Sequence, residues 1–306
     1  MARALYVLAL GIALLIMFPQ ILSAGGPRDV AGTSFFDSAT KGVPLTWAGG
    51  TVTYYTDRGN LSPVLPGASA DAFVADAFSR WTSISTAAVS AVRAGQLGED
   101  VSGSNVTASG GTLTLPADIL PSAVSTPLAI VYDADGTVTN ALLGQGAGSA
   151  SACFDNAAYG GVDNFSVDAH HLHALIILNG VCAQTSQQLP DVEYRLIRML
   201  GRVLGLDWSQ INVNVFTRSP PPTSADYLGL TIMHATDPIN CVPISLCYPH
   251  ADQPKMDDRA ALSRLYPVTA LNLASFPGKQ LFFENTVRIH GAVHFADVNG
   301  QPAQPM

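Results

Sequence analysis

Two arginines one helical turn apart, Arg198 and Arg202, are the residues whose types and spacing most directly suggest chemistry. Side chains four positions apart on a helix lie on the same face, so the two guanidinium groups would project together. Such a pair of cations can bind a carboxylate, either from a nearby acid such as Asp207 or from a ligand. The alternative is that both side chains project into solvent. Because an exposed ion pair contributes only about 0–1 kcal/mol, the burial of the arginines decides between the two interpretations.

The arginines belong to the block Arg198-Met199-Leu200-Gly201-Arg202-Val203-Leu204-Gly205-Leu206-Asp207-Trp208. This block resembles the active-site helix of metzincin zinc metallopeptidases, of the matrixin-like type found in secreted bacterial proteins, whose pattern is H-E-x-x-H-x-x-G-x-x-H. Gly205 sets the register. Two later segments extend the resemblance, which covers residues 47–267: Leu230-Thr231-Ile232-Met233 is similar to the family's Met-turn, and Asp257–Pro267 is similar to its closing helix.

The resemblance implies a zinc site held by three histidines, with a glutamate that deprotonates the zinc-bound water. Arg198, Arg202 and Trp208 occupy the three ligand positions, and Met199 occupies the position of the base. Arginine offers no lone pair, the indole nitrogen only donates, and methionine cannot act as a general base. We therefore expect no functional catalytic residue and no zinc or other cofactor. Arg198 and Arg202 become candidate binding residues, and Met233 is the surviving residue of the Met-turn.

A different metal site could draw on histidines outside this block. His171 and His173 precede the apolar run Ala174–Leu178, and alternation along a strand would place both on one face. Catalytic zinc takes three protein ligands and structural zinc takes four, so polar histidines at a strand edge are the favoured interpretation. The alternative is an active metallopeptidase with a non-standard site built from His171, His173, His234 or His250.

The first 24 residues are typical of a secretory signal peptide. Arg3 is followed by the apolar stretch Ala4–Phe18, then by Pro19 and the small-residue segment Leu22-Ser23-Ala24. A membrane anchor is the competing interpretation, but the apolar stretch is shorter than the roughly 20 residues that a span requires. We expect cleavage near Ala24, no membrane span in the mature chain, and a secreted, extracellular or cell-surface location.

Four cysteines fit an oxidising compartment and allow three disulfide connectivities. The favoured one joins Cys153 to Cys182 and Cys241 to Cys247, because the C-x5-C spacing closes a small loop easily. Metal binding is the weaker alternative, since no C-x2-C pair occurs.

The composition excludes two broad classes of protein. A net charge of −8 argues against a nucleic-acid partner, which requires a basic face. With 48% hydrophobic and only 12% charged residues, the chain is able to bury a core rather than remain disordered.

The elements that must position the candidate site follow from the apolar pattern. Strands are predicted at Thr51–Tyr55, Leu128–Tyr132 and Ala174–Leu178, and helices at Ser69–Ala94, Pro190–Leu204 and Arg259–Tyr266, with a hairpin turn at Asp133–Gly136. Glycine at position 205 should end the second helix. The predicted class is α+β. The resemblance implies a metzincin-like twisted mixed β-sheet with three main helices and a short β-rich C-terminal extension.

The predicted organisation has four parts: a signal peptide (1–24), a leader or linker (25–46), the peptidase-type domain (47–268) and a β-rich tail (269–306). Strands are expected in the tail at Gln280–Phe283 and Val287–Phe295, with a turn at Asn299-Gly300. The tail resembles the opening of a carboxypeptidase-regulatory-like module. Two alternatives stay open: the module is truncated, or its strands pack on the main domain.

Together these features predict a secreted homologue of zinc metalloendopeptidases that is catalytically inactive. It would retain binding of a peptide or an extracellular protein along the old substrate edge strand, because strand addition needs only main-chain groups. The alternatives are an active metallopeptidase with a non-standard metal site and a cell-surface structural module.

Overall fold

The computed structural model describes residues 26–209, 219–234, 244–246, 248–287, 294–296 and 302–305. The predicted signal peptide and the predicted Cys241–Cys247 pair lie outside these residues and stay predictions. The division into four parts also stays a prediction.

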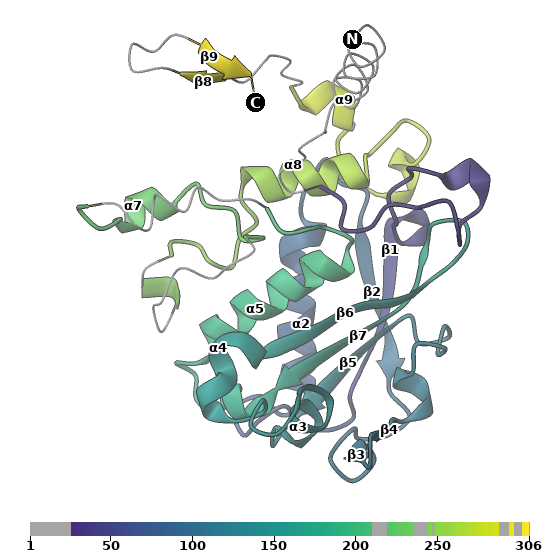
Figure 1. Cartoon of the computed structure of the whole chain (residues 1–306), viewed down its shortest axis with the longest axis vertical. Coiled ribbons are helices and arrows are strands. Elements are labelled where there is room, and N and C mark those ends of the chain that lie inside the picture. Colours follow the sequence, from purple (N-terminus) through teal and green to yellow (C-terminus); the bar gives the residue numbers. More distant parts are fainter. Residues whose placement is uncertain are drawn as a thin grey trace, which may run out of the picture.

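A five-stranded mixed sheet forms the centre of the fold, with the strand order β2-β1-β5-β7-β6 (Figure 1). Its strands are β1 (Thr51–Thr56), β2 (Ser90–Gln96), β5 (Leu128–Asp133), β6 (Ala158–Phe165) and β7 (His171–Asn179). Strands β2, β1, β5 and β7 run parallel, whereas β6 lies antiparallel to β7 at the edge. The predicted α+β class with a mixed sheet is confirmed.

The central strand β5 is buried at every residue, because both of its faces carry apolar side chains that are covered. Leu128 and Ile130 face a first core, whereas Ala129 and Val131 face a second. The predicted strands at Thr51–Tyr55, Leu128–Tyr132 and Ala174–Leu178 correspond to β1, β5 and β7 and are confirmed.

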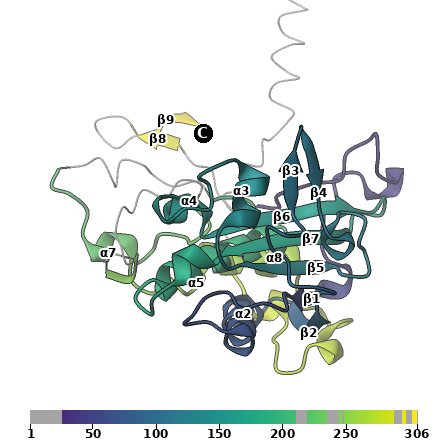
Figure 2. The ribbon, with the colours of Figure 1, turned by 90° about the horizontal axis from the view of Figure 1, so that it is seen from below.

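The helices of ten or more residues in the described part of the chain are α2 (Gly67–Thr82), α5 (Leu189–Val203) and α8 (Met256–Leu265). Helices α2 and α5 pack against each other on the first core, where the Trp81 indole nitrogen donates to the Ile197 carbonyl at 2.8 Å. The shorter elements are β3 (Thr107–Ser109), β4 (Thr112–Thr114), α3 (Thr137–Leu143), α4 (Cys153–Asn156), α7 (Ser224–Tyr227), α9 (Phe282–Asn285), β8 (His294–Ala296) and β9 (Pro302–Pro305). The β3–β4 hairpin stands off from the sheet (Figure 2).

Helix α5 begins and ends close to the predicted residues. Pro190 lies in its first turn. Two residues after the last helical residue, Val203, the backbone of Gly205 adopts a left-handed conformation with φ +90°. The Gly205 amide donates to the Arg202 carbonyl and the Leu206 amide to the Gly201 carbonyl, both at 3.0 Å. These two bonds form a Schellman motif, in which glycine avoids the steric cost of the left-handed backbone.

The first predicted helix is wrong in its second half. It ends at Thr82 instead of continuing to Ala94, and Ser90–Gln96 forms the parallel edge strand β2. The Lys279 ammonium donates to the carbonyls of Thr82 and, at 2.8 Å, of Ile84, which closes the end of the helix. Ile84 and the apolar residues after it recur at helix-like spacing, but they do not share one helix face. Ile84 and Ala87 are buried in the first core, whereas Ala88 is buried in a separate small cluster.

Two other local predictions are also wrong. Asp133–Gly136 does not form a hairpin turn but leads into α3, where the Asp133 carboxylate accepts from the amides of Val138 at 3.1 Å and Thr139 at 2.7 Å. The carboxylate therefore caps a helix. Gln280–Phe283 is not a strand, because the short helix α9 begins at Phe282.

The residues on both sides of the predicted boundary between domain and tail pack against the segment that follows α2. The amide of Val268 donates to Thr86 at 3.2 Å, and the amide of Gln280 donates to Ser85 at 2.8 Å. Val268 and Phe276 also bury Ala88 in a small cluster. Farther along, β8 and β9 form an antiparallel pair. The described part of the tail thus holds short helices as well as these two strands. The predicted turn at Asn299-Gly300 and most of the predicted strand Val287–Phe295 lie outside the described residues, and the β-rich tail and the truncated module stay predictions.

Substituting Gly205 tests whether the turn after α5 requires glycine. A Cβ at Gly205 would lie 3.0 Å from the Leu45 carbonyl oxygen, whereas at Gly42, with φ +80°, nothing lies within 4 Å of the added atom. We expect Gly42→Ala to cost about 1 kcal/mol of unfolding free energy for the backbone alone, and Gly205→Ala about 2–3 kcal/mol. Urea unfolding of both variants measures the difference, and equal losses would show that the close approach to Leu45 contributes nothing.

Candidate functional site

Helix α5 and the turn after it bring together three of the four residues at the motif positions. The guanidinium carbon of Arg198 lies 5.0 Å from the centre of the Trp208 indole ring, and that of Arg202 lies 4.7 Å from it. Both distances are within the range of cation–π attraction. The turn at Gly205 therefore returns the chain so that Trp208 contacts both arginines of the helix.

Arg198 is only 6% exposed, so it does not project into solvent. One of its terminal nitrogens donates to the carbonyl of His234 at 2.6 Å, and the other donates to the Tyr194 hydroxyl at 3.4 Å. The same hydroxyl forms a 2.8 Å hydrogen bond with Nε2 of His234. Arg198 is thereby committed to contacts inside the protein.

Arg202 is closer to the surface, with 14% of its side chain exposed, and it forms an ion pair with Asp207, the predicted partner. Its Nη1 also donates to the Leu206 carbonyl at 3.3 Å, and the Asp207 carboxylate accepts from the Trp208 amide at 2.8 Å. This carboxylate is half exposed. A ligand could therefore replace it, whereas the contacts of Arg198 are closed to solvent.

Met233 lies directly beneath α5. A Cβ on Gly201 would lie 2.5 Å from the Met233 sulfur and 2.8 Å from the Trp81 ring, so only glycine at this position allows the helix to approach so closely. The structure thus places Met233 under the arginine-bearing helix. Met199, at the position of the base, is partly buried and packs on the first core.

A buried carboxylate, Asp258, holds the turn that carries Met233. It accepts from the amides of Ile232 at 3.0 Å, Met233 at 3.1 Å and Lys255 at 2.8 Å, and from the Thr231 hydroxyl. Burial raises the pKa of this carboxyl, and the hydrogen bonds act in the opposite direction. The sequence analysis assigned Asp258 no role of its own. The signal that could have found it is the pair of adjacent acids, Asp257 and Asp258, at the start of the segment that resembles the closing helix.

The histidines do not come together as a metal site. His173 is fully buried and its Nδ1 lies 2.6 Å from the Asp163 carboxylate, and His171 is buried beside the Trp47 ring. His234 bonds to Tyr194, and His250 lies in the turn before α8. Among the described residues, no group of three or more His, Cys, Asp or Glu could hold a metal ion.

The residues at the family's zinc positions do not fit a zinc ion either. Two guanidinium groups carry fixed positive charge and no lone pair, and the indole nitrogen of Trp208 can only donate. We derive no chemistry that passes through a metal at this position.

The predicted disulfide between Cys153 and Cys182 is confirmed, with a Cα–Cα distance of 5.4 Å. It links α4 to the turn that follows β7. A disulfide fits a location outside the reducing cytoplasm. In the part of the chain that the structure describes, no helix is long and apolar enough to cross a membrane.

The sequence matches no model of a known protein family, and no curated protein matches it. Among solved structures, a chain of the "GM1 bound form of the ECX AB5 holotoxin" aligns with a TM-score of 0.37 and 10% sequence identity, over 76% of this chain and 91% of that chain. This low similarity supports no conclusion about fold or function.

The buried histidine His171 should make stability depend on pH. Burial is the main cause that lowers its pKa from 6.5 to about 4, and the neighbouring positive charge of Arg28 acts in the same direction. The unfolded chain therefore takes up a proton that the folded chain does not. The stability that neutral His171 provides is complete above pH 6.5 and is lost as the pH falls through about 4, a change on the order of 3 kcal/mol.

The variant His171→Leu removes this proton while keeping an apolar group in the site. We expect its unfolding free energy, measured in urea from pH 7 to pH 4, to fall less steeply with pH than that of the wild type. Parallel curves for the two proteins would contradict the assignment.

Proposed function

We propose that this protein is a secreted, matrixin-like metzincin homologue that has lost peptidase activity and binds an extended peptide or an extracellular protein. The observation that carries the proposal is the contact of Arg198 and Arg202 with Trp208 at the three positions where the family has zinc-binding histidines. Guanidinium groups supply fixed positive charge there but cannot polarise a water molecule as zinc does.

Several features of the fold support the family assignment. The sheet is mixed, with one antiparallel edge strand, and the arginine-bearing helix ends in a glycine turn at the expected residue. Met233 lies beneath that helix, and the buried Asp258 comes from the segment that resembles the closing helix. The disulfide supports secretion.

The edge strand β6 supports a role in binding. It pairs with β7 on one side, and no other described strand pairs with it. The Asn179 amide donates to the Ala157 carbonyl at 3.0 Å, and antiparallel alternation then directs the main-chain groups of Ala158, Gly160 and Val162 toward the free edge. A peptide could add a strand there through main-chain hydrogen bonds alone, with no catalytic residue required.

Zinc content is the first test of this proposal. We expect the mature protein, equilibrated with zinc and freed of the excess, to hold about 0.1 zinc per chain or less by elemental analysis, because the motif positions offer no lone pairs. One tightly bound zinc per chain would overturn the proposal and favour a non-standard site that includes histidines.

A restored motif provides the matched control. The variant Arg198→His/Met199→Glu/Arg202→His/Trp208→His has the ligands and the base of the family pattern. If the fold is that of a metzincin, this variant should bind about one zinc per chain. Failure of a folded restored variant to take up zinc would argue against the family assignment while leaving the wild-type result intact.

Strand addition at β6 is tested with unstructured peptides from a casein digest. We expect bound peptide to slow amide hydrogen exchange within Ala158–Phe165, and Val162→Pro to weaken binding about tenfold because it removes a main-chain donor. Val162→Ala keeps that donor and serves as the control for lost packing. Peptide binding unchanged in Val162→Pro would place the binding surface elsewhere.

A further inference from the structure

A cavity of about 340 Å³ lies against β6 and β7, and none of Arg198, Arg202 and Trp208 lines it. Its walls include the aliphatic side chains of Leu142 and Leu143 from the end of α3 and of Leu175 and Ile177 from β7. Tyr159 and Arg28 line it as well. Leu142, Leu175 and Ile177 pack on the second core, whereas Val162, which also lines the cavity, packs on the first core. The cavity therefore lies at the β6 edge of the sheet, mainly on the face of the second core.

Two glycines at the middle of β6, Gly160 and Gly161, also line the cavity. A Cβ on Gly160 would lie 1.9 Å from the Leu175 carbonyl oxygen, and one on Gly161 would lie 2.9 Å from Nη1 of Arg28. The Arg28 guanidinium thus lies directly over Gly161, where the strand carries no side chain. A positively charged group therefore forms one wall of a hollow whose other walls include several aliphatic side chains and the Asp163 carboxylate.

The backbone of Arg28 is fixed, but its side chain is lightly engaged. The Arg28 amide donates to the Gly205 carbonyl at 2.7 Å, and the neighbouring Pro27 forms a bridge with Leu206. Within the described part of the chain, the guanidinium has one ion pair, with Asp29, whose atoms are 3.5 Å apart, and it makes no hydrogen bond. The donors of Arg28 are consequently available to an anion that enters the cavity.

The carboxylate in the cavity lining, that of Asp163, already has a partner in the protein. Asp163 contributes a carboxylate, and its Oδ1 lies 2.6 Å from Nδ1 of the buried His173. This contact directs the carboxylate toward the strand β7, so Arg28 remains the charged donor for a ligand.

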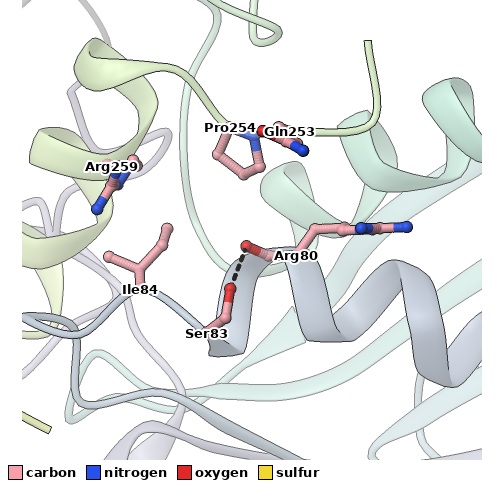
Figure 3. Close-up of a pocket in the computed structure, with 6 residues that line it drawn as sticks. All are labelled: Arg80, Ser83, Ile84, Gln253, Pro254 and Arg259. Carbon is pink, nitrogen blue, oxygen red and sulfur yellow. Dashed lines mark hydrogen bonds between the residues drawn. The ribbon is translucent and has the colours of Figure 1, made fainter. Parts of the chain in front are cut away.

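A second cavity, of about 290 Å³, also contains arginines but offers no comparable site. Arg80, Ser83, Ile84 and Arg259 contribute to its lining, and Figure 3 shows the Arg80 guanidinium directed away from Arg259. That guanidinium forms ion pairs with Asp76 at 2.8 Å and with Glu193 and Asp252 at 3.2 Å. Its charge is neutralised by protein carboxylates.

We propose that the cavity over Gly161 binds a carboxylate on a short aliphatic chain, with the carboxylate on Arg28 and the chain against the leucines and Ile177. Apolar walls with one well-placed charged group are typical of small-molecule sites, and 340 Å³ lies at the small end of their range. The ligand is either a free fatty acid or the end of a peptide with an aliphatic last residue. The cavity shares residues of β6 with the proposed strand addition, but it would hold its ligand through Arg28 and aliphatic side chains, whereas strand addition would use main-chain groups.

The test uses the mature full-length chain with octanoate, 1-octanol and N-acetyl-alanyl-leucine as probes, each titrated by calorimetry and by ligand-detected NMR. We expect octanoate or the dipeptide to bind at one site, and 1-octanol to bind at least about tenfold more weakly than octanoate because it lacks the charge-assisted hydrogen bond. The tighter of the two carboxylates identifies the source of the ligand. Absence of binding by both carboxylates would overturn the proposal.

Three variants locate the site. Arg28→Gln should weaken binding of the carboxylate about tenfold, since it removes the charge, and Leu143→Trp should block binding by filling the cavity. Arg264→Gln removes an exposed arginine of α8 that does not line the cavity and should change nothing. Thermal unfolding checks that each variant folds. Equal affinity of Arg28→Gln and wild type, or equal affinity for octanoate and 1-octanol, would refute the assignment.

Discussion

The left-handed turn at Gly205 is the constraint on which the rest of the site depends. Helix α5 ends at Val203, and the turn that follows returns the chain so that Trp208 contacts Arg198 and Arg202. The same turn presents its carbonyl to the amide of Arg28. The arginine–tryptophan contact and the charged wall of the β6 cavity are therefore both positioned by one backbone conformation that glycine adopts without strain.

Two buried ionisable side chains near this turn, Arg198 and Asp258, are stabilised by several hydrogen bonds each. Arg198 donates to the His234 carbonyl and to Tyr194, and Asp258 accepts from three amides and a hydroxyl. A buried charge is costly unless such partners replace its water, and removing one partner leaves the other uncompensated. These contacts connect α5, the Met233 turn and α8, so they fix the relative positions of three segments far apart in the sequence.

The sequence predicted the elements that depend on local pattern and missed the contacts that depend on distant partners. Strands β5 and β7 and helix α5 were predicted because their apolar runs, Pro190 and Gly205 are local signals. The strand β2 was predicted as helix because its parallel pairing with β1 joins residues about 40 positions apart, a relation that periodicity does not report. Gly205 gave the register of Arg198, Arg202 and Trp208. The spacing of residues along the sequence predicts neither the burial of Arg198 nor the approach of Arg28 to Gly161, because both depend on segments that are distant in the chain.

The turn that carries Met233 is stabilised by packing and hydrogen bonds that the chain itself provides. A Cβ on Gly201 would lie only 2.5 Å from the Met233 sulfur and 2.8 Å from the Trp81 ring, so the turn is held by close van der Waals contact and by Asp258. None of these contacts requires a metal ligand. The positive charge of Arg198 and Arg202 is covalently part of the chain and so, unlike that of zinc, cannot be removed by a chelator.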